Sequence, residues 1–104
     1  MNDKNEQELN LDIEINRLVH EPARLKILAY LSLVESADFV FLVSRIGLTM
    51  GNLSAHISKL EEAGYIKVIK EFKENRPHTM ISLTEAGGEA FLTYRERMLQ
   101  ILKE

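Results

Sequence analysis

Cysteine is absent from this chain of 104 residues. Its absence excludes disulfides, zinc sites built on thiolates and thiol nucleophiles, and it fits a cytoplasmic protein. The sequence also lacks any apolar run near the ~20 residues that a membrane span requires. Its first ten residues, MNDKNEQELN, are polar and contain no apolar stretch of the kind found in secretory signals. We therefore expect a cytoplasmic protein that does not enter a membrane.

Sequence signatures of catalysis are missing as well. His20, His56 and His78 fall in different predicted elements, and no metalloprotease, serine-hydrolase or phosphate-loop motif occurs. The Gly87-Gly88 pair lacks the lysine that follows in a phosphate loop. We expect no enzyme, no catalytic residue, no cofactor and no metal. A metal sensor with a histidine and carboxylate site between subunits is an alternative that the sequence leaves open.

Negative charge is concentrated at the N-terminal end. The whole chain has a formal charge of −3. Residues 1–22 contain six acidic and two basic side chains, so the remaining residues carry one net positive charge. Nucleic-acid binding depends on a local basic patch rather than on the total charge. The composition therefore permits a DNA-binding protein of modest, salt-sensitive affinity.

The hydrophobic content of 45% suits one domain with one core. We expect a polar arm over residues 1–8 and a single domain over 9–104. The start of that domain has two interpretations. An alternating pattern typical of a strand is formed by Leu9, Leu11, Ile13 and Ile15. One face of a helix would contain Leu11, Ile15, Leu18 and Val19. We predict a helix over 9–19, which Pro22 would end.

Further along the chain, the apolar spacing predicts helices over 22–34, 39–46, 50–63 and 85–103. Asp38, Thr49 and Thr84 are suited to cap the last three of these helices. Gly47 and Gly64 allow the left-handed conformation that ends a helix. Between 66 and 83 the period changes to two, which predicts a β-hairpin with its turn at 74–77. The predicted fold class is mainly α (α+β), with one hairpin on the C-terminal side.

A short Gly-Leu-Thr turn joins helices 39–46 and 50–63, which is typical of a helix-turn-helix, and the hairpin adds a wing. Four phrases occur in order: HEPARL at 20–25, GNLSAH at 51–56, LEEAGY at 60–65 and LTEAG at 83–87. Through these phrases, residues 18–100 resemble the small stand-alone winged-helix transcriptional regulators related to the MarR and ArsR groups. The resemblance implies a winged helix-turn-helix fold and binding of double-stranded DNA.

Helix 50–63 has two different faces. Leu53, Ile57 and Leu60 recur at the spacing of a buried stripe. The other face carries short side chains, and a helix enters the major groove only if its leading side chains are short. Solvation of polar residues near a helix cap is the simpler interpretation. The predicted DNA contacts of this helix are Thr49, Gly51, Asn52, Ser54, Ala55, His56, Ser58 and Lys59.

The hairpin adds positive charge. In the related fold the wing flanks the minor groove, whose negative potential favours arginine. The predicted wing contacts are Lys70, Lys73, Arg76 and His78, with Arg76 at the tip. The chain reads Glu74-Asn75-Arg76 there, which departs from the Asp and Arg pair usual in MarR wings. Arg24 is a candidate contact to the DNA backbone, with a solvated surface charge as the alternative.

The last helix has an apolar stripe too wide for the core of a small domain. We therefore predict a two-fold homodimer formed by helices 9–19 and 85–103. The predicted seam contains Leu11, Ile15, Phe91, Tyr94, Met98, Ile101 and Leu102. Such a dimer would hold two recognition helices about 34 Å apart. The alternative is that the last helix packs along segment 9–19 of its own chain.

These patterns together predict a sequence-specific transcriptional regulator that binds double-stranded DNA as a homodimer. Helix 50–63 would enter the major groove, and the 66–83 wing would contact the minor groove or the backbone. A winged-helix adaptor that binds proteins instead of DNA is the alternative, which the negative total charge and the wide apolar last helix would suit. No feature of the sequence indicates a particular small-molecule effector.

Overall fold

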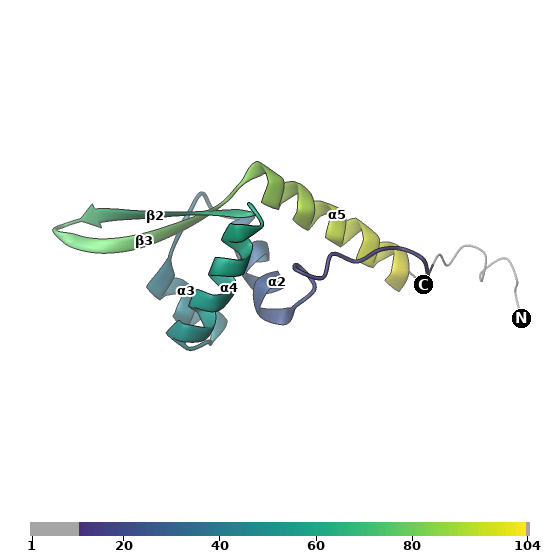
Figure 1. The fold of residues 1–104 in the computed structure, drawn as a ribbon, viewed down its shortest axis with the longest axis horizontal. Coiled ribbons are helices and arrows are strands. Elements are labelled where there is room, and N and C mark those ends of the chain that lie inside the picture. Colours follow the sequence, from purple (N-terminus) through teal and green to yellow (C-terminus); the bar gives the residue numbers. More distant parts are fainter. Residues whose placement is uncertain (1–10, 104) are drawn as a thin grey trace, which may run out of the picture.

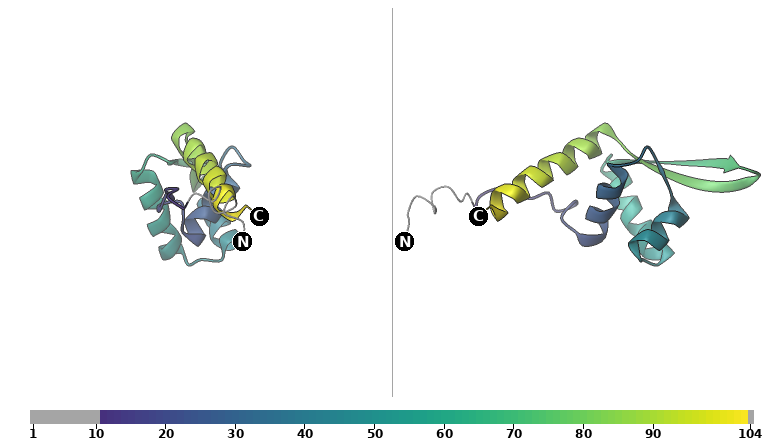
Figure 2. Two further views of the ribbon diagram at one scale, coloured as in Figure 1. Left: turned by 90° about the vertical axis from the view of Figure 1, so that its right-hand side faces the viewer. Right: turned by 180° about the vertical axis from the view of Figure 1, so that it is seen from behind.

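The computed structural model describes residues 11–103, which form an N-terminal segment over 11–20, called the arm from here on, four helices and a three-stranded sheet. The elements follow one another as α2 (Pro22–Leu31), β1 (Ala37–Asp38), α3 (Phe39–Ile46), α4 (Met50–Glu62), β2 (Ile66–Lys73), β3 (Arg76–Leu83) and α5 (Glu85–Leu102). The β2–β3 hairpin projects at one end of the molecule, and α5 with the arm extends at the other (Figure 1). The view from behind shows the same division around the three central helices (Figure 2). The winged helix-turn-helix prediction is confirmed.

The helix ends are set by the residues that the sequence indicated. Asp38 Oδ1 accepts the Val40 N–H at 2.8 Å, Thr49 Oγ1 accepts the Asn52 N–H at 3.1 Å, and Thr84 Oγ1 accepts the Gly87 N–H at 3.0 Å. Each bond satisfies a donor that the first helical turn leaves free. Gly47 and Gly64 both have a φ of +80°, which glycine adopts without a Cβ penalty. Helix α2 ends at Leu31 and not at residue 34, since the chain turns at Ser32.

The core lies where α2, α3 and α4 meet the base of the sheet. Its largest fully buried side chains come from all four of these parts of the fold, with Val19 of the arm added. They are Ile27, Leu28, Leu31, Leu42, Leu53, Leu60, Ile81 and Val19. Burying one such side chain contributes about 1.5–3 kcal/mol. The core therefore fixes α4 against the rest of the domain.

The sheet has one strand more than the sequence predicted. Strand β1 pairs antiparallel with β3, and the strand order is β1-β3-β2. A two-residue strand is too short to give an alternating pattern, so its tertiary partner decides its conformation. The wing turn is also tighter than predicted. Glu74 and Asn75 alone form it, with φ values of +53° and +62°, and Arg76 and Pro77 belong to β3.

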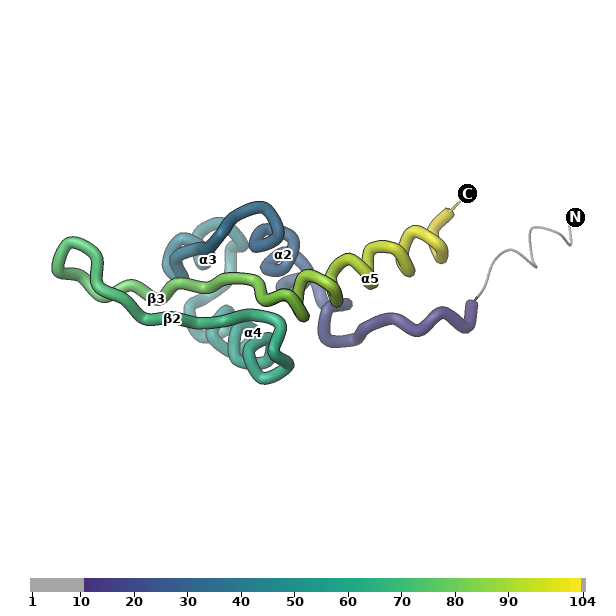
Figure 3. Tube along the Cα trace, turned by 90° about the horizontal axis from the view of Figure 1, so that it is seen from above, coloured from purple at the N-terminus to yellow at the C-terminus, as the bar shows by residue number. Residues whose placement is uncertain are grey.

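The helix predicted over 9–19 is wrong for residues 11–19, which form a turn at 11–12, an irregular segment at 13–16 and a second turn at 17–19, while 9 and 10 lie outside the described residues. Asn16 provides the physical reason. Its Oδ1 accepts the N–H groups of Leu18 and Val19 at 3.0 and 3.2 Å, a local bond that competes with a helix. The arm then runs beside α5 (Figures 1 and 3).

Within residues 11–103, none of the helices is both long enough and apolar enough to cross a membrane.

Candidate nucleic-acid interface

Helix α4 presents one polar face to solvent. Leu53, Ile57 and Leu60 are buried and hold the opposite face in the core. Seven of the eight predicted contact residues of this helix are exposed together on the outer side: Thr49, Gly51, Asn52, Ser54, Ala55, Ser58 and Lys59. The helix is thus anchored by three apolar side chains and leaves a narrow polar surface free.

Gly51 is part of that narrow surface. A Cβ built at this position would meet no atom within 4 Å among the described residues, and the φ of Gly51 is not positive. Glycine lowers helix stability by about 1 kcal/mol relative to alanine. Neither packing nor backbone geometry therefore requires glycine here. Close approach of a partner to the start of α4 is a physical reason for keeping the position free of a side chain.

His56 differs from its neighbours on α4. It is half-buried, and its Nδ1 lies 3.0 Å from Nη1 of Arg24. A guanidinium only donates hydrogen bonds, so Nδ1 of His56 is the acceptor in this contact. The carboxylate of Glu21 lies 3.8 Å from the same nitrogen.

Arg24 is engaged inside the protein. Besides the contact with His56, its Nε donates to the backbone oxygen of Leu18 at 2.6 Å. The Glu21 carboxylate accepts the Arg24 backbone N–H at 2.7 Å and thereby caps α2. Arg24 therefore links the arm, the start of α2 and helix α4. Arg24 and His56 are 32 positions apart in the sequence, and no periodic pattern of residues predicts a contact over that separation.

The wing carries its cations near the tip. Lys70, Lys73 and Arg76 are all exposed, and Lys73 lies directly opposite Arg76 in the ladder. Lys73 Nζ is 4.0 Å from a carboxylate oxygen of Glu71, a loose surface pair that contributes little to stability. The three cations thus remain accessible on a projecting hairpin, and their contact with DNA stays a prediction.

His78, the fourth predicted wing contact, is half-buried and bonds to Asp38 on the neighbouring strand. Its Nδ1 lies 2.6 Å from Asp38 Oδ2, and both side chains are about one-third exposed or less. The hydrogen bond from His78 is the main reason why the pKa of Asp38 lies below its ordinary value of 3.8, and the backbone N–H groups of Val40 and Phe41 lower it further. The pair joins the wing to the start of α3, so His78 orients the wing in this structure.

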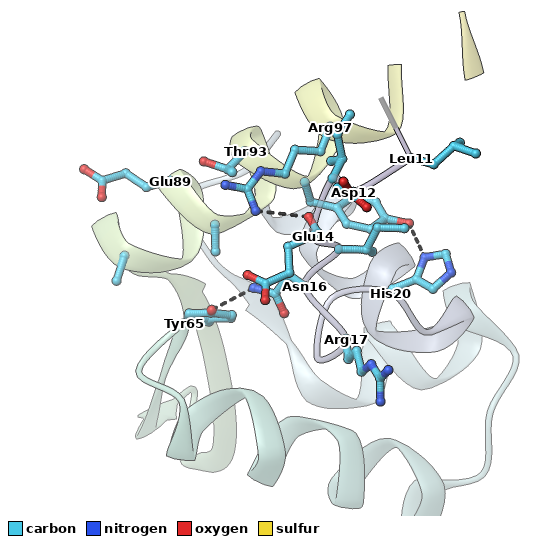
Figure 4. A pocket seen from close by; sticks show the side chains of 15 residues that line it. Leu11, Asp12, Glu14, Asn16, Arg17, His20, Tyr65, Glu89, Thr93 and Arg97 are labelled. Atoms are coloured by element: carbon cyan, nitrogen blue, oxygen red, sulfur yellow. Dashed lines mark hydrogen bonds between the residues drawn. The ribbon is translucent and has the colours of Figure 1, made fainter. Parts of the chain in front are cut away.

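A cleft of about 980 Å³ lies between the arm and α5 (Figure 4). Two hydrogen bonds join its two walls, and a third joins the arm to Tyr65, which lies between α4 and β2. Asn16 donates to the Tyr65 hydroxyl at 2.9 Å, His20 Nδ1 pairs with the Tyr94 hydroxyl at 2.8 Å, and Arg97 donates to the Glu14 backbone oxygen at 3.0 Å. Helix α5 therefore packs along the arm of its own chain, which is the predicted alternative to a dimer seam, although the arm is not helical.

The residues predicted for a dimer seam are divided by this packing. Tyr94 is 7% exposed and belongs to the core of its own chain, which leaves little of it for a second protomer. Ile15, Phe91 and Met98 are half-buried against the same core, and Ile101 is half-buried. Leu11 and Leu102 remain exposed. A second apolar stripe on α5 consists of the exposed Leu92, Leu99 and Leu102. Of these three residues, only Leu102 belongs to the predicted seam.

No group of three His, Asp or Glu side chains that could hold a metal ion occurs within residues 11–103. The ring nitrogens of the three histidines each contact a different partner: Tyr94 for His20, Arg24 for His56 and Asp38 for His78. The histidines therefore act separately, each as a link between two elements of the fold.

Comparison with known proteins places this geometry in a family. An uncharacterised protein of Methanocaldococcus jannaschii is 37% identical over 87 residues, which cover 84% of this chain and 95% of that protein. The structure of a transcriptional regulator homologue from Pyrococcus horikoshii has a TM-score of 0.73 at 27% identity, covering 99% of this chain and 100% of that chain. A mutant of MarR from E. coli shares the fold, with a TM-score of 0.68 at 16% identity and coverage of 90% and 69%.

The transcriptional regulator BldR from Sulfolobus solfataricus shares it too, with a TM-score of 0.62 at 22% identity and coverage of 98% of this chain and 73% of that chain. The fold is therefore that of the MarR-like regulators. The model of a family described as winged helix DNA-binding domain matches residues 23–102. This chain accordingly belongs to the winged helix DNA-binding domain family.

Proposed function

We propose that this protein is a cytoplasmic transcriptional regulator that binds double-stranded DNA in a sequence-specific manner as a homodimer. Helix α4 lies in the major groove, and the β2–β3 wing contacts the minor groove or the phosphate backbone. The observation that carries the proposal is the exposed face of α4. It combines slim residues with hydrogen-bonding side chains and is rigidly supported from behind.

The chemistry of this face suits base edges. Asn52 can form two hydrogen bonds with adenine, and the hydroxyls of Ser54 and Ser58 can reach a base or a phosphate. Lys59 adds a positive charge toward the end of the helix. The free N–H groups in the first turn of α4 favour a phosphate oxygen nearby. The cations of the wing, at the end of the molecule away from α5, give a second contact with the backbone (Figure 1).

The exposed stripe on α5 supports the homodimer. Leu92, Leu99 and Leu102 are each more than half exposed, although leucine is usually buried. A second copy that covers this stripe would bury it and would hold two α4 helices about 34 Å apart, one turn of DNA. The bound site would then be close to a palindrome, because the dimer has two-fold symmetry.

Selection of bound sequences from a random DNA pool, read at two salt concentrations, tests the proposal. The expected result is a palindromic motif whose half-sites are about 10 base pairs apart, together with an affinity that falls as salt rises. A pool that shows no enrichment at the lower salt concentration would overturn the regulator in favour of an adaptor that binds proteins.

Variants then locate the interface. Combining Asn52→Ala, Lys59→Ala and Arg76→Ala should abolish detectable binding to the selected site. Lys26→Ala is the control, because it removes an exposed positive charge from α2, outside α4, the wing and the apolar stripe of α5. Equal DNA affinity of the triple variant and the control would show that α4 and the wing are not the interface. Analytical ultracentrifugation tests the dimer, and a monomer at micromolar concentration would overturn that part.

A further inference from the structure

Phe72 is unusually exposed for an aromatic residue. Its side chain is 76% exposed, the largest fraction among the aromatic residues described between 11 and 103. It lies one position before the last residue of β2 and pairs with Pro77 across the ladder. The two form an exposed apolar pair near the tip of the wing. An aromatic ring kept in water gains nothing from the hydrophobic effect, so the core does not explain this position.

Strand register shows which side of the wing carries this pair. Side chains alternate along a strand, so every second residue pair shares a face. The pairs Ile66–Leu83 and Val68–Ile81 lie on the face that packs on the core. The same face continues outward with the Lys70–Thr79 pair and then with the Phe72–Pro77 pair. The core face of the hairpin therefore becomes a free surface where the wing passes beyond α3 and α4 (Figures 1 and 3).

Positive charge lies on both sides of the apolar pair. Lys70 precedes Phe72 by two residues on the same face. Lys73 and Arg76 form the next cross-strand pair toward the tip, and by the same alternation they point to the other face of the hairpin. Of the two acidic residues nearby, Glu71 lies on the face of Lys73 and Arg76, with its carboxylate 4.0 Å from Lys73 Nζ, and Glu74 lies in the turn, so Lys70 is the charged residue that shares the face of Phe72. An apolar patch flanked by cations is complementary to a polyanion that also has apolar walls. The minor groove of DNA fits this description, because phosphates border it and sugar carbons line its walls.

We propose that Phe72, backed by Pro77, packs against the sugar walls of the minor groove and makes the wing a reader of groove width. This inference rests on the proposed DNA-binding function and names the residue that senses shape. A ring gains most from two close walls, so binding favours the narrow minor groove of A·T tracts beside each half-site. Aromatic and proline side chains are used as apolar contacts by other proteins that bind the minor groove.

The test compares three wing variants on the DNA that the wild-type protein selects. Phe72→Ala should bind about tenfold more weakly, with an unchanged slope of log affinity against log salt, because no charge is removed. It should also lose the preference for A·T pairs flanking the half-site. Phe72→Leu should retain most of both properties, since it keeps an apolar side chain. Arg76→Ala, the matched wing control, should lower the salt slope by about one.

Each outcome decides between the two proposals. If Phe72→Ala matches the wild type in affinity and in flank preference, the role of Phe72 is refuted, while DNA binding by the protein stands. If the wild-type protein selects no DNA, the proposed function and this inference fall together. Thermal unfolding of Phe72→Ala should match the wild type, because the ring is exposed. A large loss of stability would show that Phe72 has a structural role and would overturn the inference.

Discussion

Replacing Gly87 by alanine disturbs the junction between α5 and the wing. Gly87 is buried in the first turn of α5. An added Cβ would overlap the backbone oxygen of Tyr65 and would lie 2.8 Å from its carbonyl carbon and 2.9 Å from Leu83 Cδ1. The Tyr65 oxygen also accepts the Thr84 N–H at 3.0 Å. The obstacle is thus hydrogen-bonded backbone, which cannot rotate away as a flexible side chain would.

Two opposing effects set the size of the change. Alanine is favoured over glycine in a helix by about 1 kcal/mol. Overpacking usually costs about 1–3 kcal/mol and occasionally more, and a contact with backbone belongs at the upper end. We expect Gly87→Ala to lower the free energy of unfolding by about 2 kcal/mol, the difference between these two effects.

Gly88→Ala is the control next in the chain. Among the described residues its added Cβ would meet only Leu83 Cδ2, at 3.7 Å, an ordinary van der Waals distance. This variant should therefore gain up to about 1 kcal/mol from helix propensity. Urea unfolding at one fixed protein concentration measures both variants, because the stability of a dimer depends on concentration. Equal stability of the two variants would refute the assignment of Gly87 as the site of close backbone contact.

Three further predictions follow from single contacts. Thr49→Ala removes the cap of α4 and should lower the free energy of unfolding by about 1 kcal/mol in urea titrations; no change would mean that the cap bond is not formed. His78→Ala should raise the pKa of Asp38 toward 3.8, measured by carbon-13 titration of the carboxyl group. Because the pKa of Asp38 is lowered in the folded protein, its ionised carboxylate stabilises the fold above pH 3.8, and this stabilisation is lost as the pH falls through the folded pKa. In His78→Ala, the free energy of unfolding should therefore fall less over this acidic range than in the wild type. Arg24→Ala should weaken DNA binding with an unchanged salt slope, since Arg24 holds α4 through His56; a slope lower by about one would identify Arg24 as a phosphate contact instead.

The contacts of His56, His78 and Arg24 could not be predicted from the sequence. The sequence suggests His56 and His78 as DNA contacts, but in this structure each is bonded inside the protein, to Arg24 and to Asp38. Residue type and exposed spacing can suggest a contact with a partner. They cannot show that an arginine 32 positions away already occupies the same ring nitrogen. The sequence identifies Phe72 only as a strand residue, because its exposure depends on where the core ends beneath the wing.

The arm and the last helix show the same limit for the fold. Leu11 and Ile15 are compatible with a strand or a helix, and local pattern cannot choose between them. The local bonds of the Asn16 side chain end the helical pattern. Tertiary bonds of Asn16 to Tyr65 and of Arg97 to the Glu14 backbone, between residues distant in sequence, then fix the path of the arm. The width of the α5 stripe follows correctly from the sequence. The burial of Tyr94 on one part of it, and the exposure of Leu92 and Leu99 on another, depend on where the arm lies.

The sequence by itself determined helices α2 to α5 except for the end of α2, the caps of α3, α4 and α5, and the hairpin, because apolar period, capping side chains and glycines act over a few residues. Asp38, Thr49, Thr84, Gly47 and Gly64 are therefore recognisable as helix ends from local pattern alone. Tertiary structure alone decided the path of the arm, strand β1 and the internal partners of the histidines. Those features depend on contacts between residues distant in sequence, which form only when the chain folds, and the local spacing of residues does not predict such contacts.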